Sequence, residues 1–208
     1  QCPSHAIQSV LEFARQLPRD RLVITGSHGS LYPGGMLRET GARIVVRDEP
    51  EQTVLETARV FQNRSDSRFN AAFSKVEGIS YSDNGKIHHN PPRQLPDMDG
   101  FPSPAYDLIN LGDYYYELLG DNFALLETSR GCPFSCTFCN QSMFQNRYRK
   151  RTDEKILQEL DTLIEAHGCR SLYIFDLEFT VNRKMAQRVC MHLIEKGYAK
   201  RLGFRWTC

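Results

Sequence analysis

The sequence has 208 residues, of which 40% are hydrophobic and 25% are charged, and its formal net charge is +1. A chain of this length can bury a sizeable core, in one large domain or two small ones. The near balance of charge argues against nucleic acid or a membrane surface as the main partner. No stretch approaches the length of a membrane span, and the N-terminal residues lack the features of a signal peptide.

The first part of the chain alternates predicted helices with short apolar strands. Apolar residues at helical spacing predict a helix over 6–17, and a second helix over 49–61 opens with acidic residues. The apolar runs 21–26 and 43–47 predict strands, and a loop rich in Gly and Ser follows the first of them. Short strands that are apolar throughout indicate a parallel sheet covered on both faces. Residues 1–75 are therefore predicted to form the C-terminal part of a doubly wound, Rossmann-like α/β domain.

Residues 76–118 are predicted to connect two domains. Two short runs flank Asp83-Asn84-Gly85, which favours a hairpin because its turn needs residues that tolerate positive φ. Residues 91–104 then carry five of the ten prolines, which oppose regular strand pairing. We expect a semi-rigid linker here and the main domain boundary.

The last part of the chain, residues 119–208, returns to alternating strands and helices. The predicted elements, in order, are a strand at 122–129, a helix at 153–168, a strand at 171–179, a helix at 183–197 and a strand at 202–206. Successive βα units of this kind are typical of the start of a (β/α) barrel, in which the chemistry lies at the carboxyl ends of the strands.

The seven cysteines are unevenly spread. Cys132, Cys136 and Cys139 lie within eight residues, whereas the other four stand alone, at Cys2, Cys169, Cys190 and Cys208. A secreted disulfide scaffold would be shorter and would pair its cysteines, so the pattern predicts a cytoplasmic protein with one functional cluster. Cys169, Cys190 and Cys208 are expected as small buried side chains. Because the chain lacks an initial Met and stops directly after an apolar run, we expect a fragment of a longer protein.

The spacing CxxxCxxC at Cys132, Cys136 and Cys139 indicates a metal centre. Thiolates suit zinc or iron–sulfur clusters. A structural zinc site usually takes four ligands as two separated CxxC pairs, and no second pair follows here. A [4Fe–4S] cluster held by three cysteines leaves one iron open to another ligand. The spacing favours the open cluster, with zinc as the alternative.

The stretch CPFSCTFC, placed after the first barrel strand, resembles the cysteine motif of the radical S-adenosylmethionine (SAM) superfamily. The resemblance implies that the three cysteines bind a [4Fe–4S] cluster whose fourth iron is chelated by SAM. It also implies that Phe138 lies against the adenine of SAM. At the end of the second strand the relatives have an acidic or Gly-Gly-Glu-like stretch, so Asp176 or Glu178 is expected to meet the SAM amino group. The alternative for these two residues is an acidic strand end that caps the next helix.

The first part of the chain resembles the second half of the cobalamin-binding domain found before many radical SAM barrels. In that resemblance Thr25-Gly26-Ser27-His28 and Asp48-Glu49-Pro50-Glu51-Gln52-Thr53 match its two characteristic segments, except that Asp48 and Pro50 replace glycines. The loop from Thr25 to Gly29, which includes Gly26, Ser27 and His28, would receive the nucleotide tail of cobalamin. Ser4, in the segment 2–5, would also approach the cofactor. His28 is not assigned to the cobalt, and its alternative is a loop histidine that caps nearby backbone.

These resemblances predict a radical SAM enzyme that depends on cobalamin and methylates an unactivated carbon. A cyclase or rearrangement enzyme, or a relative that has lost cobalamin, is the alternative within enzymes. A non-catalytic metal- or cobalamin-binding module is the alternative from another class. The family implies an electron donor such as flavodoxin or ferredoxin and an organic substrate, while nucleic acid and membranes are not expected as partners.

Overall fold

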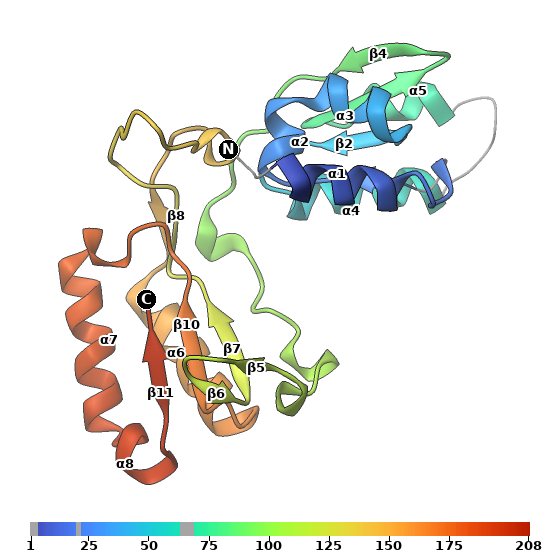
Figure 1. Cartoon of the computed structure of the whole chain (residues 1–208). Helices are drawn as coiled ribbons and strands as arrows, with labels where there is room; N and C mark the ends of the chain where they lie inside the picture. The colour runs from blue at the N-terminus through green and yellow to red at the C-terminus, as the bar shows by residue number, and fades with distance from the viewer. Residues whose placement is uncertain (1–3, 20–21, 63–68) are drawn as a thin grey trace. The chain divides into compact units, whose positions relative to one another are not determined.

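The computed structural model divides the chain into two compact units (Figure 1). The residues that it describes are 4–19, 22–62 and 69–208. The ranges assigned to the first unit are Gln1–Leu95 and Cys136–Asn146, and those assigned to the second are Pro96–Ser135 and Arg147–Cys208. Within the described ranges, no helix is long and apolar enough to cross a membrane.

The first unit is a four-stranded sheet with helices on both faces. Its elements are α1 (Ser4–Ala14), β1 (Val23–Ile24), α2 (Ser27–Leu31), α3 (Pro33–Thr40), β2 (Ile44–Val46), α4 (Glu51–Gln62), α5 (Phe69–Phe73), β3 (Ile79–Asp83), β4 (Lys86–His89) and the short 3-10 helix η5 (Ser142–Phe144). The strands lie in the order β1-β2-β3-β4. β1 and β2 are parallel, whereas β3 is antiparallel to both of its neighbours, β2 and β4.

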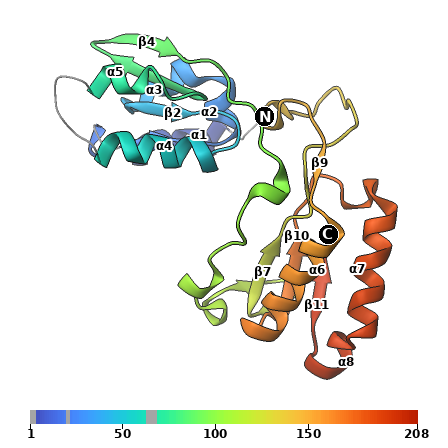
Figure 2. The same ribbon diagram turned by 180° about the vertical axis from the view of Figure 1, so that it is seen from behind.

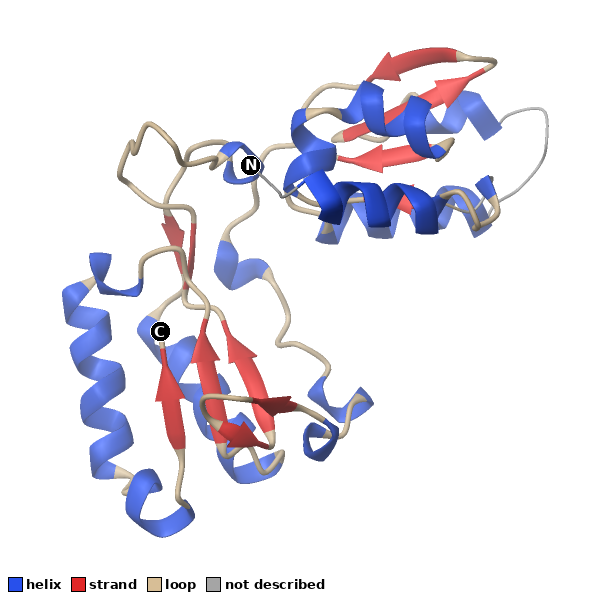
Figure 3. Ribbon diagram, viewed as in Figure 1, coloured by secondary structure: helices blue, strands red, loops and turns tan. Residues whose placement is uncertain are grey.

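Alternate residues of β2 divide the apolar core of this unit between the two faces of the sheet. Val45 packs with Met36 and Leu37 of α3, and Leu11 of α1 joins this cluster. Ile44, on the other face, packs with side chains of α4 and α5. The helix–sheet–helix layering expected of a doubly wound domain is visible in Figure 3.

Two predictions for the first part of the chain are wrong in detail. The hairpin around Asp83 was expected in a separate connector, but it adds β3 and β4 to the sheet of the first unit, which is therefore mixed and not parallel. The loop expected after β1 is instead helical, as α2 and the start of α3. Gly26 makes this possible with a φ of 105°, and Pro33 opens α3 at a position where the missing N–H costs nothing.

The second unit contains a three-stranded parallel sheet in the order β11-β10-β7. Its helices and strands are η2 (Met98–Gly100), η3 (Tyr106–Leu108), η4 (Leu111–Asp113), β5 (Tyr115–Tyr116), β6 (Gly120–Asp121), β7 (Phe123–Leu126), β8 (Ser129–Arg130), β9 (Arg149–Lys150), α6 (Asp153–Asp161), the π-helical turn η6 (Thr162–Ala166), β10 (Ser171–Ile174), η7 (Phe179–Val181), α7 (Arg183–Glu195), α8 (Tyr198–Leu202) and β11 (Arg205–Thr207). β5 pairs with β6 and β8 pairs with β9, both antiparallel.

One face of this sheet is packed against helices and the other is more open. Ala124, Leu126, Leu172 and Ile174 point into a core built with α6 and α7, which both lie on that side (Figure 2). On the opposite face Leu125 is exposed. The alternation of β7 thus follows from its half-buried sheet position. The arrangement of strands and covering helices agrees with the predicted start of a (β/α) barrel.

Several predicted boundaries in this unit need correction. The strand expected over 171–179 ends at Ile174, and the strand expected over 202–206 begins at Arg205. The single turn α8 before it was not predicted, because it is bounded by Gly197 and Gly203, with φ values of 65° and 66°, which sequence patterns read simply as a stop. Among the isolated cysteines, Cys169 is buried as expected, but Cys190 is only partly buried and Cys208 is exposed.

Candidate iron–sulfur and cofactor sites

The three cysteines lie in the loop 131–148, which leaves the second unit between β8 and β9. These strands pair Ser129 with Lys150 and Arg130 with Arg149. Gly131 opens the loop with a φ of 76°, and a Cβ at this position would lie 2.0 Å from the carbonyl oxygen of Arg147. The two ends of the loop therefore approach so closely that only glycine fits at its start.

A single carboxylate fastens the base of this loop to the neighbouring strand end. Asp176, just after β10, accepts a hydrogen bond from the Thr128 backbone N–H at 2.7 Å and one from the Ser129 hydroxyl at 2.7 Å. The Thr128 hydroxyl is a third donor to the same carboxylate. Thr128 and Ser129 are buried. The structure thus gives Asp176 a role that neither sequence interpretation named, since it braces the two strand ends from which the site is built.

Glu178 caps the helical turn that follows it, as the alternative interpretation of the acidic strand end predicts. Its carboxylate accepts a hydrogen bond from the Thr180 backbone N–H at 3.2 Å and caps η7, and the Thr180 hydroxyl also donates to it. A contact of Asp176 or Glu178 with the SAM amino group stays a prediction.

The thiols themselves are accessible. Cys132 is partly buried, whereas Cys136 and Cys139 are exposed and joined by a backbone hydrogen bond from the Cys139 N–H to the Cys136 carbonyl at 3.0 Å. The Phe138 side chain between them is 90% exposed, so the described structure leaves its aromatic face open to a ligand. In the described ranges, no three His, Cys, Asp or Glu side chains are gathered as a metal-holding group. The donor set of three reduced thiols nevertheless has the soft chemistry that an iron–sulfur cluster requires.

Tyr148 is a residue of this region that the sequence analysis did not single out. Burial raises the pKa of the Tyr148 phenol, and the nearby carboxylate of Asp176 and thiol of Cys132 raise it further, while the nearby Ser129 hydroxyl lowers it. A neutral phenol therefore lies beside the first cysteine. The sequence does not predict this position near Cys132, because Tyr148 lies within the basic run NRYRKR and belongs to no recognisable motif.

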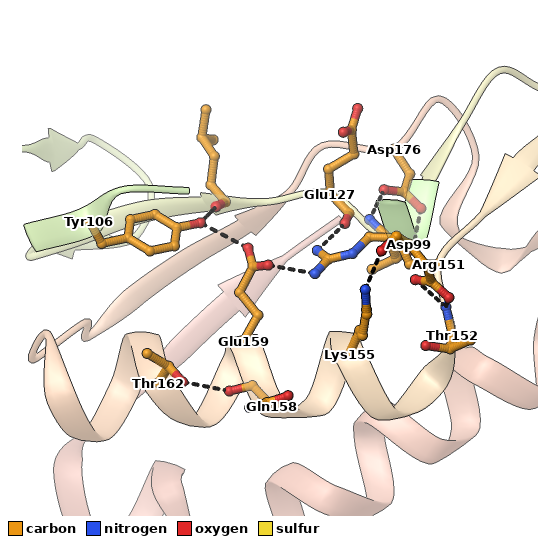
Figure 4. A network of polar contacts seen from close by, with 12 residues as sticks. Asp99, Tyr106, Glu127, Arg151, Thr152, Lys155, Gln158, Glu159, Thr162 and Asp176 are labelled. Carbon is orange, nitrogen blue, oxygen red and sulfur yellow. Dashed lines mark hydrogen bonds and ion pairs between the residues drawn. The ribbon is translucent and has the colours of Figure 1, made fainter. Parts of the chain in front are cut away.

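A buried ion pair supports the strand that carries the loop (Figure 4). Glu159 of α6 is almost fully buried and accepts hydrogen bonds from Arg151 at 2.6 Å and from the Tyr106 hydroxyl at 3.0 Å. Arg151 also donates to the Glu127 carbonyl at 3.1 Å, beyond β7. Burial and the Glu159 carboxylate strongly raise the pKa of Tyr106, which keeps it a donor. Arg151, which follows the cysteine loop, thus connects α6 to the chain just after β7.

The residues expected to bind cobalamin lie at the carboxyl end of β1, except Ser4, which is the first residue of α1. Thr25 and Ser27 are exposed, and Gly26 turns the chain into α2. Gly29 is buried, and a Cβ there would lie 3.2 Å from Val45, so this glycine lets α2 approach the sheet. His28 lies in α2 with its ring centroid 6.3 Å from that of Tyr32. Cofactors bind doubly wound domains at such strand ends.

Asp48 explains one departure from the cobalamin-domain pattern. It follows β2 with a φ of 59°, in the left-handed region that glycine adopts freely and Asp tolerates. Its backbone N–H donates a hydrogen bond to the Ser30 hydroxyl at 2.8 Å. Asp48 thus adopts here a backbone conformation that glycine would also adopt without strain.

The fold and the cysteine loop together define a class of protein. Residues 126–208 match the sequence profile of the Radical SAM superfamily, so this part of the chain carries a radical SAM domain. An uncharacterised methyltransferase of Pyrococcus horikoshii is 31% identical over 203 residues, which cover 96% of this chain and 42% of that protein. An anaerobic magnesium-protoporphyrin IX monomethyl ester cyclase of Cereibacter sphaeroides is 28% identical over 196 residues, covering 93% of this chain and 31% of the relative.

A solved structure extends the fold similarity to almost the whole chain. The radical SAM methyltransferase TsrM from Kitasatospora setae, solved with cobalamin and a [4Fe–4S] cluster bound, superimposes with a TM-score of 0.60 at 17% identity. The matched region covers 94% of this chain and 37% of TsrM. The chain thus spans less than half the length of each of these proteins.

Proposed function

We propose that this chain is part of a radical SAM enzyme that uses cobalamin to methylate an unactivated carbon. The observation that carries the proposal is the position of CPFSCTFC. It follows the first strand of a parallel sheet whose next strand end is fastened to it by Asp176. The methyltransferase relative and the similarity to TsrM support methyl transfer.

In this proposal Cys132, Cys136 and Cys139 would hold the cluster through their thiolates. When bound, the cluster supplies the electron that cleaves SAM into methionine and a 5′-deoxyadenosyl radical. Phe138 would cover the adenine, and the loop Thr25–Gly29 would receive cobalamin. An electron donor such as flavodoxin or ferredoxin would supply the electron.

Ring formation is the second candidate. The observation that favours it is the similarity to the magnesium-protoporphyrin ester cyclase, which spans almost as much of this chain (93%) as the methyltransferase match does (96%). The three cysteines and Asp176 would serve both reactions in the same way, so the distinction lies in the products.

Anaerobic reconstitution of the purified protein tests the proposal. Iron and sulfide are added, followed by cobalamin, a reductant and SAM, and the metals, bound corrinoid, 5′-deoxyadenosine and S-adenosylhomocysteine are measured. We expect about four irons per chain and both SAM products, with both products lost in Cys136→Ala. Cys190→Ala, which removes a partly buried thiol on α7 outside the motif, should retain them.

The other outcomes discriminate among the alternatives. Stoichiometric zinc without iron would overturn the radical SAM assignment and favour a non-catalytic module. Deoxyadenosine without any bound corrinoid would remove cobalamin from the proposal. Deoxyadenosine with corrinoid but without S-adenosylhomocysteine would favour cyclisation or rearrangement.

A further inference from the structure

The segment Cys136–Asn146 carries two of the three cysteines and belongs to the first unit, although it lies far along the chain. Within this segment η5 lies against α2. The Gln141 carbonyl accepts backbone hydrogen bonds from Phe144 at 3.0 Å and Asn146 at 3.3 Å. Gln145 and Asn146 then adopt left-handed backbone conformations, with φ values of 50° and 53°. This conformation is uncommon for residues other than glycine and needs support from its surroundings.

The Gln145 side chain supplies that support. Its amide nitrogen donates to the Asp48 carboxylate at 3.2 Å and to the Arg93 carbonyl at 2.8 Å. A primary amide has two N–H donors, and both are used. We call these two hydrogen bonds the Gln145 clamp.

Asp48, one of the two acceptors of the clamp, is itself hydrogen-bonded to the segment that follows β1. The Asp48 backbone N–H donates to Ser30, and the Ser30 hydroxyl donates to the Gly26 carbonyl at 2.9 Å. A continuous series of hydrogen bonds thus runs from the cysteine segment to the residues that follow β2 and β1. Networks of this kind fix one geometry when all their members are satisfied.

We infer that Gln145 is a positioning residue for the iron–sulfur loop, which it holds by clamping the segment of Cys136 and Cys139 to Asp48 and Arg93. Both thiols are exposed, so the packing of their own side chains does not fix them. A metal site is competent only when its ligands are held close to their final geometry. The inference rests on the proposed function, because the role assigned to the clamp is to prepare the loop for a cluster.

Two variants remove the clamp by different physical routes. Gln145→Met keeps the length of the side chain without any donor. Gln145→Glu keeps its shape but places a carboxylate against the Asp48 carboxylate and the Arg93 carbonyl. Asp48→Asn should retain the clamp, because its amide oxygen still accepts and Asn tolerates positive φ. Gln62→Glu, at the exposed end of α4, is the matched control.

Hydrogen exchange of the purified protein without a cluster is measured first. We expect amides of 136–146 to exchange about tenfold faster in Gln145→Met and Gln145→Glu, a factor that corresponds to about 1.4 kcal/mol. Exchange in α6 and β10 should not change. After anaerobic reconstitution, both variants should bind less iron than the unmodified protein, and the reduced cluster should give a broadened electron paramagnetic resonance signal. Asp48→Asn and Gln62→Glu should match the unmodified protein in each measurement.

Each contrary result has a definite meaning. Unchanged exchange over 136–146 would show that the clamp does not hold the segment. Faster exchange with full iron content and an unchanged signal would reduce Gln145 to a local stabilising residue and overturn its positioning role. Failure of the unmodified protein to bind iron would instead overturn the proposed function, and the exchange comparison would still test the clamp.

Discussion

Backbone conformation at single residues decides where the cysteine loop begins. Gly131 and Gly168 have similar positive φ values, 76° and 69°. They differ in their surroundings, because a Cβ on Gly131 would collide with the Arg147 carbonyl, whereas nothing lies within 4 Å of a Cβ on Gly168. The pair separates the effect of backbone strain from the effect of steric overlap.

We therefore expect Gly131→Ala to lower the free energy of unfolding by about 2 kcal/mol or more beyond the loss in Gly168→Ala. Both variants carry the left-handed penalty of about 1 kcal/mol, and only the first must also open the β8–β9 ladder. Trp206 is the single tryptophan and packs on Phe179 with ring centroids 5.9 Å apart, so its fluorescence reports unfolding of the second unit. Equal losses in denaturant titrations of the two variants would show that the loop ends can separate without cost.

Asp176 is the residue whose structural and functional interpretations are most sharply testable. Asp176→Asn presents an amide N–H₂ to at least one of its three donors, which should cost about 2 kcal/mol of unfolding free energy. Glu178→Gln keeps an oxygen acceptor for the Thr180 N–H and should change it by less than about 0.5 kcal/mol. Denaturant unfolding measures both. If Asp176→Asn keeps full stability but loses SAM binding in a titration, Asp176 acts as a SAM contact and its hydrogen bonds to Thr128 and Ser129 do not contribute to stability.

At the scale of elements, Asp161 connects α6 to α7 and α8. Burial alone raises the pKa of Asp161, but hydrogen bonds from Tyr198, His192 and Lys196 outweigh it and hold this pKa below the ordinary value of 3.8. The folded state therefore binds this proton more weakly than the unfolded state. The resulting stability is present above pH 3.8 and is lost as the pH falls through the lower pKa of the folded state.

We accordingly expect the stability difference between the unmodified protein and Asp161→Asn to be largest near neutral pH and to shrink below a pH of about 4. Tyr198→Phe removes one of the three donors and should show a smaller difference with the same pH dependence. Urea unfolding followed at Trp206 over this range measures both. A difference that stays constant down to a pH of about 2 would show that the Asp161 hydrogen bonds do not favour the ionised carboxylate.

The sequence predicts the helices and strands of this fold better than it predicts which strands pair with one another. Helix α1 follows from apolar residues at helical spacing, α4 follows from the acidic residues that open it, and the β3–β4 hairpin follows from Asn84 and Gly85, because these signals are local. The side on which the hairpin pairs is set by β2, a distant segment, so its place in the first sheet could not be predicted. For the same reason the local spacing of the three cysteines predicts a metal centre, whereas Asp176, Tyr148 and Gln145 make their contacts with residues far away in the chain.

At the scale of the whole molecule, the chain leaves the second unit after Ser135, contributes Cys136–Asn146 to the first unit and returns at Arg147. The sequence predicts one connector, at 76–118, so that the chain would pass from the first domain to the second only once. The observed division means that part of the candidate iron–sulfur loop is stabilised by the elements proposed to bind cobalamin. A ligand that orders the β1 and β2 ends should therefore also order this segment.

Addition of cobalamin tests this coupling. We expect hydroxocobalamin to slow hydrogen exchange over 26–31 and 136–146 together, by up to about a hundredfold when free ligand reaches about 100 times its dissociation constant. In Gln145→Met the protection of 26–31 should persist, while that of 136–146 should fall, because the hydrogen bonds through Asp48 no longer reach the segment. Protection confined to 26–31 in the unmodified protein would show that cobalamin binds without ordering the cysteine segment. Slower exchange throughout both units would indicate global stabilisation, in which case Gln145→Met would leave both segments equally protected.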